Sequence, residues 1–303
     1  MTLLKTMKED FLKFSQTNPL YFIASIIYFF LAAESFPSIS RFPIGYVIAA
    51  ILYFISLGIV FSPLGEKILR FLERVRKLET KEEKEYLLPL FEEVYEQAKQ
   101  QNPELGEIEL CVIDRITVNA CAIGKHTIAV TKGAMKTFKE DELKALMAHE
   151  IAHILYGDTI AKLYTVIGNG LFTIYLVALR TVLAIVDFVQ TLYKRPGSER
   201  LLVIIIRLIL DLMIFFIMSL MQAVVAINSR KNEYRADHYA STLGYGEGLL
   251  KALYLLEKMK LGDNSTIIQR MTASHPRITA RIEQLETLLD EETAMQMNPL
   301  PLS

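Results

Sequence analysis

The residues best suited to chemistry begin with two histidines four positions apart, His149 and His153, in a His-Glu-x-x-His pattern. In a helix this spacing places both imidazoles on one face, where they can share one tetrahedral metal ion. Glu150 then projects toward the open coordination position, where a carboxylate can take a proton from metal-bound water. The alternative is two surface histidines on an amphipathic helix. The pattern favours a zinc centre with one protein base.

A third metal ligand decides between these alternatives. A metzincin would need a histidine six residues past His153, but Thr159 occupies that position. A gluzincin uses a glutamate from a second helix, and Glu233 and Asp237 lie four residues apart downstream. Glu233 can bind the metal, while Asp237 can accept a hydrogen bond from the ring nitrogen that a ligand histidine leaves unused. The alternative is a solvated helix face whose acidic residues pair with Arg230 and Arg235.

Long apolar stretches must position these residues. Hydrophobic residues make up 52% of the 303-residue chain, charged residues 22%, and the net charge of −1 gives no indication of a nucleic-acid partner. A membrane-spanning helix needs roughly 20 apolar residues. We therefore predict an integral membrane protein with four transmembrane or membrane-embedded helices. The apolar stretches cover residues 20–33, 44–61, 163–193 and 201–227.

The distribution of basic residues predicts the orientation, because cytosolic flanks carry the excess of lysine and arginine. Three lysines precede the first stretch, only Arg41 separates the first two, and five basic residues occur in 67–77. The N-terminus and the segment after residue 62 are therefore expected in the cytosol. A cleaved signal peptide is the alternative for 20–33, but the second stretch follows at once, as in a helical hairpin. Basic residues in 194–200 weaken the rule for the second hairpin, which is either shallow or spans against its charge bias.

The remaining segments predict a small mixed soluble part. Residues 63–101 have helical spacing, and strands are expected at 107–112, 118–123 and 127–131, with a turn at Gly124-Lys125. Thr137 and Glu140 form a capping-box pattern for a helix ending near 157–158. Cys111 and Cys121 are expected to be reduced, half-buried small hydrophobes. Further helices are expected at 228–243, 246–260 and 276–289, followed by a frayed end.

These expectations combine into one fold class: mostly α with a small β-sheet, carrying a gluzincin-type cytosolic protease domain. The N-terminal transmembrane hairpin is assigned to 1–62, and the second membrane hairpin to 163–227. The protease domain is divided between residues 63–162, with the His-Glu-x-x-His helix, and residues 228–303.

At this point the sequence resembles the HtpX-type membrane zinc metalloproteases, relatives of the CAAX prenyl endopeptidases. The resemblance runs from about residue 110 to 286. It rests on 118–122, 148–158, 229–237, and Ser274-His275-Pro276 followed by Arg281-Ile282. The layout of the two hydrophobic hairpins also matches.

The resemblance implies one zinc ion per chain, bound by His149, His153 and Glu233, with Glu150 as general base. It places Asn119 and Ala120 beside the substrate backbone, on a strand along the cleft, and His275 near the developing oxyanion. Cys121 departs from the family pattern, in which an aromatic residue is common there. The implied function is cleavage of misfolded or damaged membrane proteins at the cytosolic face of the cell (inner) membrane. Its partners would be unfolded polypeptides and the lipid bilayer.

Two alternatives stay open from the sequence. A narrow-specificity prenyl-protein endopeptidase would share the metal site, but such relatives usually have more membrane helices. A non-proteolytic membrane transporter or scaffold is suggested by charged residues within the apolar stretches, because charges at membrane depth are candidates for functional sites. These charges are Arg180, Asp187, Arg207 and Asp211.

Overall fold

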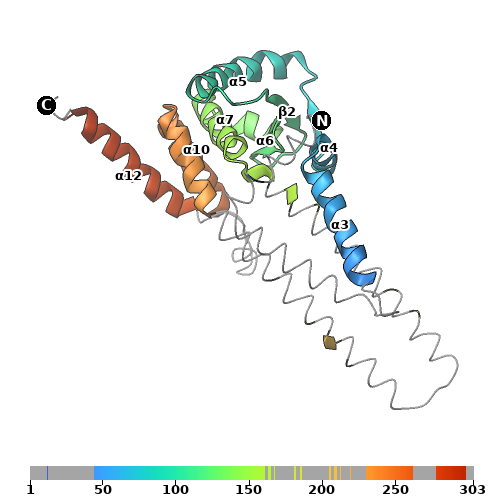
Figure 1. Cartoon of the computed structure of the whole chain (residues 1–303). Helices are drawn as coiled ribbons and strands as arrows, with labels where there is room; N and C mark the ends of the chain where they lie inside the picture. The colour runs from blue at the N-terminus through green and yellow to red at the C-terminus, as the bar shows by residue number, and fades with distance from the viewer. Residues whose placement is uncertain are drawn as a thin grey trace. The chain divides into compact units, whose positions relative to one another are not determined.

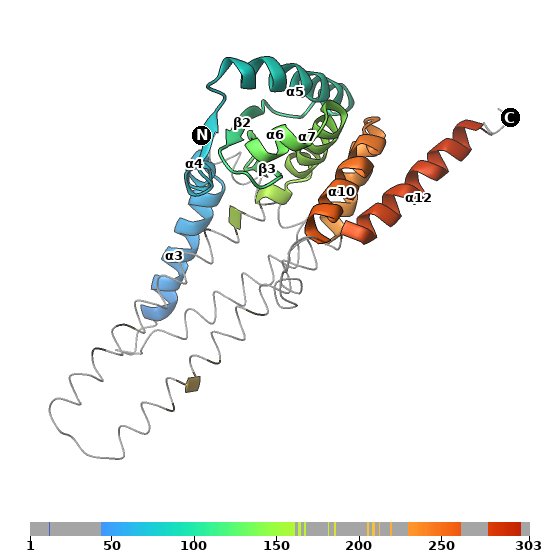
Figure 2. The same ribbon diagram turned by 180° about the vertical axis from the view of Figure 1, so that it is seen from behind.

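The computed structural model describes residues 44–160, 230–261 and 278–297, with isolated positions elsewhere in the chain. By its internal contacts the chain divides into two units, 1–62 with 164–225 and 63–163 with 226–303. Figure 1 draws the chain, and Figure 2 shows it from behind. The apolar stretches 20–33, 163–193 and 201–227 fall largely outside the described residues, as do their four charges. Their membrane assignment therefore stays a prediction.

The first unit is described mainly through helix α3 (Ile44–Val60), which corresponds to the second apolar stretch. Its 17 residues carry no charge, and Ile51 and Phe54 are exposed. Among the described residues no single helix has both the length and the apolar character needed to cross a membrane. Residues 50–60 and 63–72, a bent pair separated by a short break, meet those criteria only when taken together.

The second unit contains a four-stranded mixed sheet in the order β1-β2-β4-β3. Strands β1 (Val75–Lys77) and β2 (Glu109–Ile113) are antiparallel, β2 and β4 (Thr127–Thr131) are parallel, and β3 (Ala120–Ile123) is antiparallel to β4. Strand β3 is therefore an edge strand. Because side chains alternate across a sheet, Val112, Val130 and Ala120 face the main core, whereas the register partners Cys111, Ala129 and Cys121 face the other side.

Helices cover both faces of this sheet. On the core side, α7 (Glu140–Leu155) packs against β3 and β4, α5 (Lys81–Gln101) packs against α7, and α10 (Gly246–Leu261) lies between α7 and α12 (Ile278–Met297). Both views show α10 beside α12 (Figures 1 and 2). On the other side, the short helix α4 (Pro63–Leu72) contacts β1 and β3. Helix α7 is buried from Leu143 to His153 apart from Lys144, so its chemistry-bearing residues lie inside the core.

The coarse sequence prediction of mostly helix with a small sheet is confirmed, with several local corrections. The helical interpretation of 63–101 is wrong in its middle, where β1 separates α4 from α5. The capping box at Thr137 and Glu140 is also wrong, because Thr137 ends the short helix α6 (Lys132–Thr137). Helix α7 instead begins after Lys139, whose N–H donates to Glu142. The C-terminal helix extends past the expected residue 289 to Met297.

One further local prediction is confirmed, and a second is confirmed in part. Gly124 has φ +60°, as the turn between β3 and β4 requires, and a side chain there would collide with the carboxylate of Glu66. Cys111 and Cys121 form no disulfide, as expected, and Cys121 is half-buried, whereas Cys111 is fully buried rather than half-buried.

An ion-pair network fixes the start of α5 to the sheet. The buried carboxylate of Glu83 accepts hydrogen bonds from the guanidinium of Arg76 at 2.6 and 3.0 Å and from the Thr80 N–H at 3.3 Å, while the Thr80 hydroxyl accepts from the Glu83 N–H. Arg76 also donates to Asp114 at 2.7 and 2.8 Å. The Arg76 guanidinium, more than offsetting the effect of burial, lowers the pKa of Glu83 to about 2.

We therefore expect Glu83→Gln to lower the free energy of unfolding at neutral pH by about 3 kcal/mol, since the lowered pKa reports stabilisation of the charged form. A carboxyl pKa that is lower in the folded state stabilises the fold above the unfolded value of 4.5, and this stabilisation is lost as the pH falls toward about 2. Thermal unfolding of the wild type and Glu83→Gln should differ at pH 7 and converge in acid. Glu82→Gln, at an exposed neighbour, is the control, and an equal loss there would contradict the prediction.

Candidate metal centre

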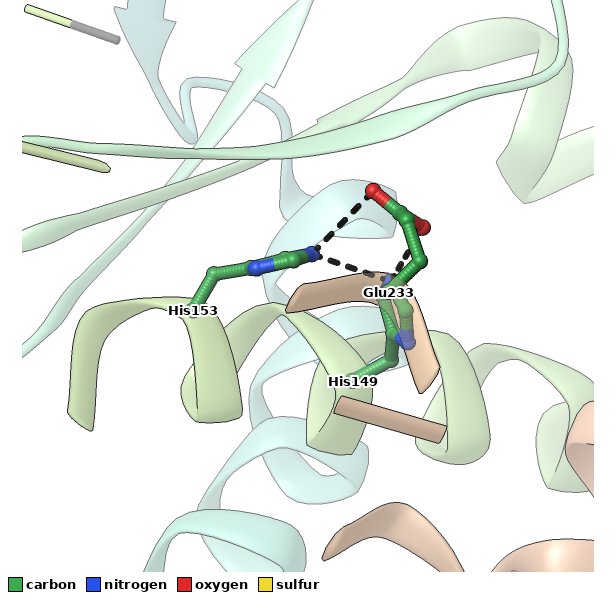
Figure 3. A group of neighbouring side chains, drawn as sticks. All are labelled: His149, His153 and Glu233. Carbon is green, nitrogen blue, oxygen red and sulfur yellow. Dashed lines mark hydrogen bonds and ion pairs between the residues drawn. The ribbon is translucent and has the colours of Figure 1, made fainter. Parts of the chain in front are cut away.

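Two helices bring the three predicted ligands together (Figure 3). His149 and His153 lie one turn apart on α7, and Glu233 lies on the helix that covers 230–242. One ligand atom from each residue lies within 4.8 Å of the others, and all three side chains are buried. The two histidine Nε2 atoms are 3.2 Å apart, and the Glu233 carboxylate oxygens lie 3.4 and 3.6 Å from them.

These separations suit a tetrahedral metal ion. Ligand atoms that bind zinc at about 2.0–2.1 Å in a tetrahedron are about 3.3 Å from one another. Two imidazole nitrogens and one carboxylate oxygen are also ligands that zinc accepts, and three protein ligands leave one position for water or substrate. The residues present therefore fit a zinc ion in both donor type and spacing.

The remaining nitrogen of each histidine contacts a buried carboxylate. His153 Nδ1 lies 3.0 Å from Asp158, and His149 Nδ1 lies 2.9 Å from Asp237 in a close contact that is bent rather than linear. Such contacts orient the rings so that both Nε2 atoms face the same point. Gly157, with φ +76°, ends α7 in the left-handed conformation and turns the chain so that Asp158 reaches back to His153.

Each of these carboxylates is held by an arginine. Arg281 of α12 donates to Asp237 at 2.7 and 2.5 Å and lies 2.9 Å from the nearer oxygen of Glu233. Arg235 donates to Asp158 at 2.7 Å, and its guanidinium stacks over the ring of Tyr156 at 4.2 Å. The two ligand histidines are therefore each supported by an aspartate and an arginine.

The electrostatics of the site depend on this pairing. Burial alone would lower the pKa of His149, but the contacts with Asp237 and Glu233 outweigh it and raise the pKa to about 9. Burial alone would raise the pKa of Asp237, whereas His149 and Arg281 bring it below its ordinary value. The negative charge that surrounds the histidines therefore favours a cation at their position. A bound metal ion must displace any proton that His149 carries.

Glu150 lies next to His149 and is buried, 6% exposed. One of its carboxylate oxygens accepts a hydrogen bond of 2.7 Å from the N–H of Ala122 on the edge strand β3. This hydrogen bond orients the carboxylate through one oxygen, while the other oxygen takes no part in it. The arrangement can bind a divalent cation and move a proton beside it.

The structure describes all but one of the predicted site residues. Ala120 begins β3, the strand that reaches Glu150, and Asn119 directly precedes it, whereas His275 lies outside the described residues. The sequence patterns predict no role at the metal centre for Asp158, Arg235 or Arg281. Asp158 was identifiable, because a ligand histidine usually donates its second ring nitrogen to a carboxylate, and Asp158 lies five residues after His153. The arginines were not identifiable, because their contacts join helices that are distant in the sequence.

Comparison with known proteins identifies the family. The model of peptidase family M48 matches residues 81–289, which contain the whole metal centre. The chain belongs to peptidase family M48. This M48 chain is 28% identical over 258 residues to "Protease HtpX" of Cellvibrio japonicus, covering 80% of the chain and 82% of that protein. It is 28% identical over 298 residues to "Protease HtpX homolog" of Dictyoglomus turgidum, covering 90% and 93%.

The resemblance to the HtpX-type proteases is thereby confirmed, and the M48 chain is a metalloprotease. Among solved structures, the crystal structure of S. mikatae Ste24p superposes with a TM-score of 0.48 at 19% identity. The match covers 94% of this chain and 66% of that one.

We expect Asp158→Asn to weaken metal binding about 10- to 100-fold, because the ring of His153 loses its charged partner. Competition with a chromophoric chelator measures the affinity for zinc directly. Asp237→Asn should produce a loss of similar size through His149. Asp141→Asn, at an exposed position of α7, is the matched control. Unchanged zinc affinity in Asp158→Asn would show that His153 is oriented by other contacts.

Proposed function

We propose that this M48 chain is a zinc-dependent endopeptidase that cleaves misfolded or damaged membrane proteins. The observation that carries the proposal is the buried group His149, His153 and Glu233, with its ligand atoms within 4.8 Å of one another and Glu150 beside it. Zinc bound there would supply Lewis-acid activation of water and of the scissile carbonyl. The family match supports peptide-bond hydrolysis as the reaction.

Glu150 is the general base in this proposal. Its one oxygen is held by the Ala122 N–H, so the other is positioned to accept a proton from the attacking water. Glu150 then returns the proton to the leaving amine. His275 is proposed to stabilise the oxyanion, on the resemblance of the 274–276 motif alone.

We propose that the substrate backbone binds along the edge strand β3. The Ala122 N–H points away from β4 toward Glu150, and residues two apart in a strand direct their backbone groups to the same side. The N–H and C=O of Ala120 therefore lie on the outer edge, where an extended substrate can add as a further strand. The backbone of Asn119 is already bonded to Thr131, so its contribution would come from its side chain.

The cell (inner) membrane is the proposed location, with the N-terminus and the protease unit in the cytosol. The uncharged helix α3, the apolar stretches that precede and separate the metal-binding segments, and the basic residues that follow α3 support this orientation. Unfolded polypeptides and the bilayer are then the natural partners. Proteolysis by the purified chain in detergent, with casein as an unfolded substrate and zinc added after chelation, tests the proposal.

Glu150→Gln should retain zinc and lose proteolysis by about 10²–10⁴-fold or more, because the ligands remain while the proton acceptor is removed. Metal content measured by atomic absorption and casein cleavage separate the two effects. Glu140→Gln, at an exposed position of the same helix, should cleave normally. Substantial cleavage by Glu150→Gln would exclude Glu150 as the base.

Glu233→Ala should lose both zinc and activity, since it removes one of three ligands. The same metal analysis provides the readout, and Glu247→Ala is a control at an exposed side chain of the neighbouring helix α10. Full zinc occupancy in Glu233→Ala would mean that another residue completes the site.

A further inference from the structure

Helix α4 turns its polar side toward the protein. Glu66, Arg70 and Glu73 follow one another at spacings of four and three residues, so they form a stripe along one face that continues just past the helix end. Every member of this stripe contacts the sheet or its loops. The contacts join Glu66 to the N–H of Lys125 at 3.1 Å and to the Thr127 hydroxyl at 2.5 Å, Arg70 to Glu109 at 2.8 Å, and Glu73 to Arg115 at 2.9 Å.

The apolar side of α4 consequently faces outward. Phe71 is 83% exposed and Leu72 is 56% exposed. Ile116, which follows the ion-paired Arg115 in the loop after β2, is 94% exposed. A helix on the surface of a soluble domain normally buries its apolar stripe and exposes its polar one. Helix α4 has the opposite arrangement, so its outer face requires an apolar environment.

The residues that precede and flank α4 indicate that this apolar environment is a lipid bilayer. Helix α4 begins three residues after the end of the uncharged helix α3. Lys67 and Arg74 are exposed near the outward face. Basic residues beside an apolar stripe are typical of helices that lie in the headgroup region of a bilayer, where lysine and arginine meet lipid phosphates.

We propose that α4 is an interfacial helix that rests on the lipid bilayer through Phe71, Leu72 and Ile116. Because its polar stripe holds β1, β2 and the β3–β4 turn, the helix would fix the distance between the membrane surface and the edge strand β3. The inference rests on the proposed membrane location. It assigns a lipid-binding surface to the protease unit itself, separate from the apolar stretches.

Quenching by brominated lipids tests the proposal on the full chain in nanodiscs. The chain carries Glu150→Gln to prevent self-cleavage and Cys121→Ala to remove the half-exposed thiol, while Cys111 is fully buried. A fluorophore is attached to Phe71→Cys, to Ile51→Cys in α3 as a membrane reference, or to Glu85→Cys in α5 as an aqueous reference. We expect brominated lipid to reduce the emission at positions 71 and 51 and to leave position 85 unchanged.

Each other outcome overturns the proposal for a different reason. Quenching at 51 but not at 71, with position 71 open to aqueous iodide, would place α4 in water. Quenching at 51 with position 71 closed to both quenchers would mean that protein covers α4, either another segment or a second copy. If brominated lipid quenched neither position 51 nor position 71, the result would contradict the proposed membrane location as well. Casein cleavage by the wild type is independent of these readouts, so the proposed protease activity can fail or survive separately.

A pair of variants links the surface to activity. Phe71→Glu should cleave casein in detergent as the wild type does, because Phe71 lies on the outer face of α4. The same variant should cleave a membrane-protein substrate in nanodiscs several-fold more slowly, while Phe71→Leu, which keeps the apolar surface, should not. Equal rates for Phe71→Glu and Phe71→Leu in nanodiscs would contradict the role of α4 at the bilayer.

Discussion

The burial of four carboxylates around two histidines is the constraint on which the protease unit depends. Glu150, Glu233, Asp158 and Asp237 are all at least nine-tenths buried. Two guanidinium groups, of Arg235 and Arg281, lie against three of them. With neutral histidines this leaves a formal excess of two negative charges in the described part of the site. An unpaired buried charge is strongly unfavourable, so a divalent cation would match this excess.

This requirement explains why the site draws on three helices that are distant in sequence. Helix α7 supplies the histidines and the base, helix 230–242 supplies Glu233 and Asp237, and α12 supplies Arg281. Arg281 contacts both acidic residues of the second helix, so the C-terminal helix is part of the electrostatic balance of the metal centre. Edge strand β3 joins the same assembly through the Ala122 N–H.

The sequence was most informative where a residue pattern has a local geometric meaning. Residues four apart on α7 and on helix 230–242 share a face in any helix, so their placement follows from the local structure alone. The turn at Gly124 likewise depends only on a positive φ, which glycine adopts readily. The sequence patterns did not predict the features that depend on contacts between residues distant in sequence. Strand β1 exists because Val75, Arg76 and Lys77 pair with β2, which no local pattern reveals. The roles of Asp158 and Arg281 likewise depend on contacts made across the fold, although Asp158 stands only five residues from His153.

The ion pair between Asp158 and Arg235 has a consequence for the chain that lies between them. The two residues are 77 positions apart in sequence, yet their side chains meet at 2.7 Å. The ion pair therefore brings the two ends of the intervening chain together at the metal centre. Because the entropy of closing a flexible loop rises by only about 0.6 kcal/mol for each doubling of its length, added flexible chain ahead of the helix that carries Glu233 would cost the centre little free energy. The ion pair therefore lets the two helices that supply the metal ligands meet whatever the length of flexible chain that separates them in sequence.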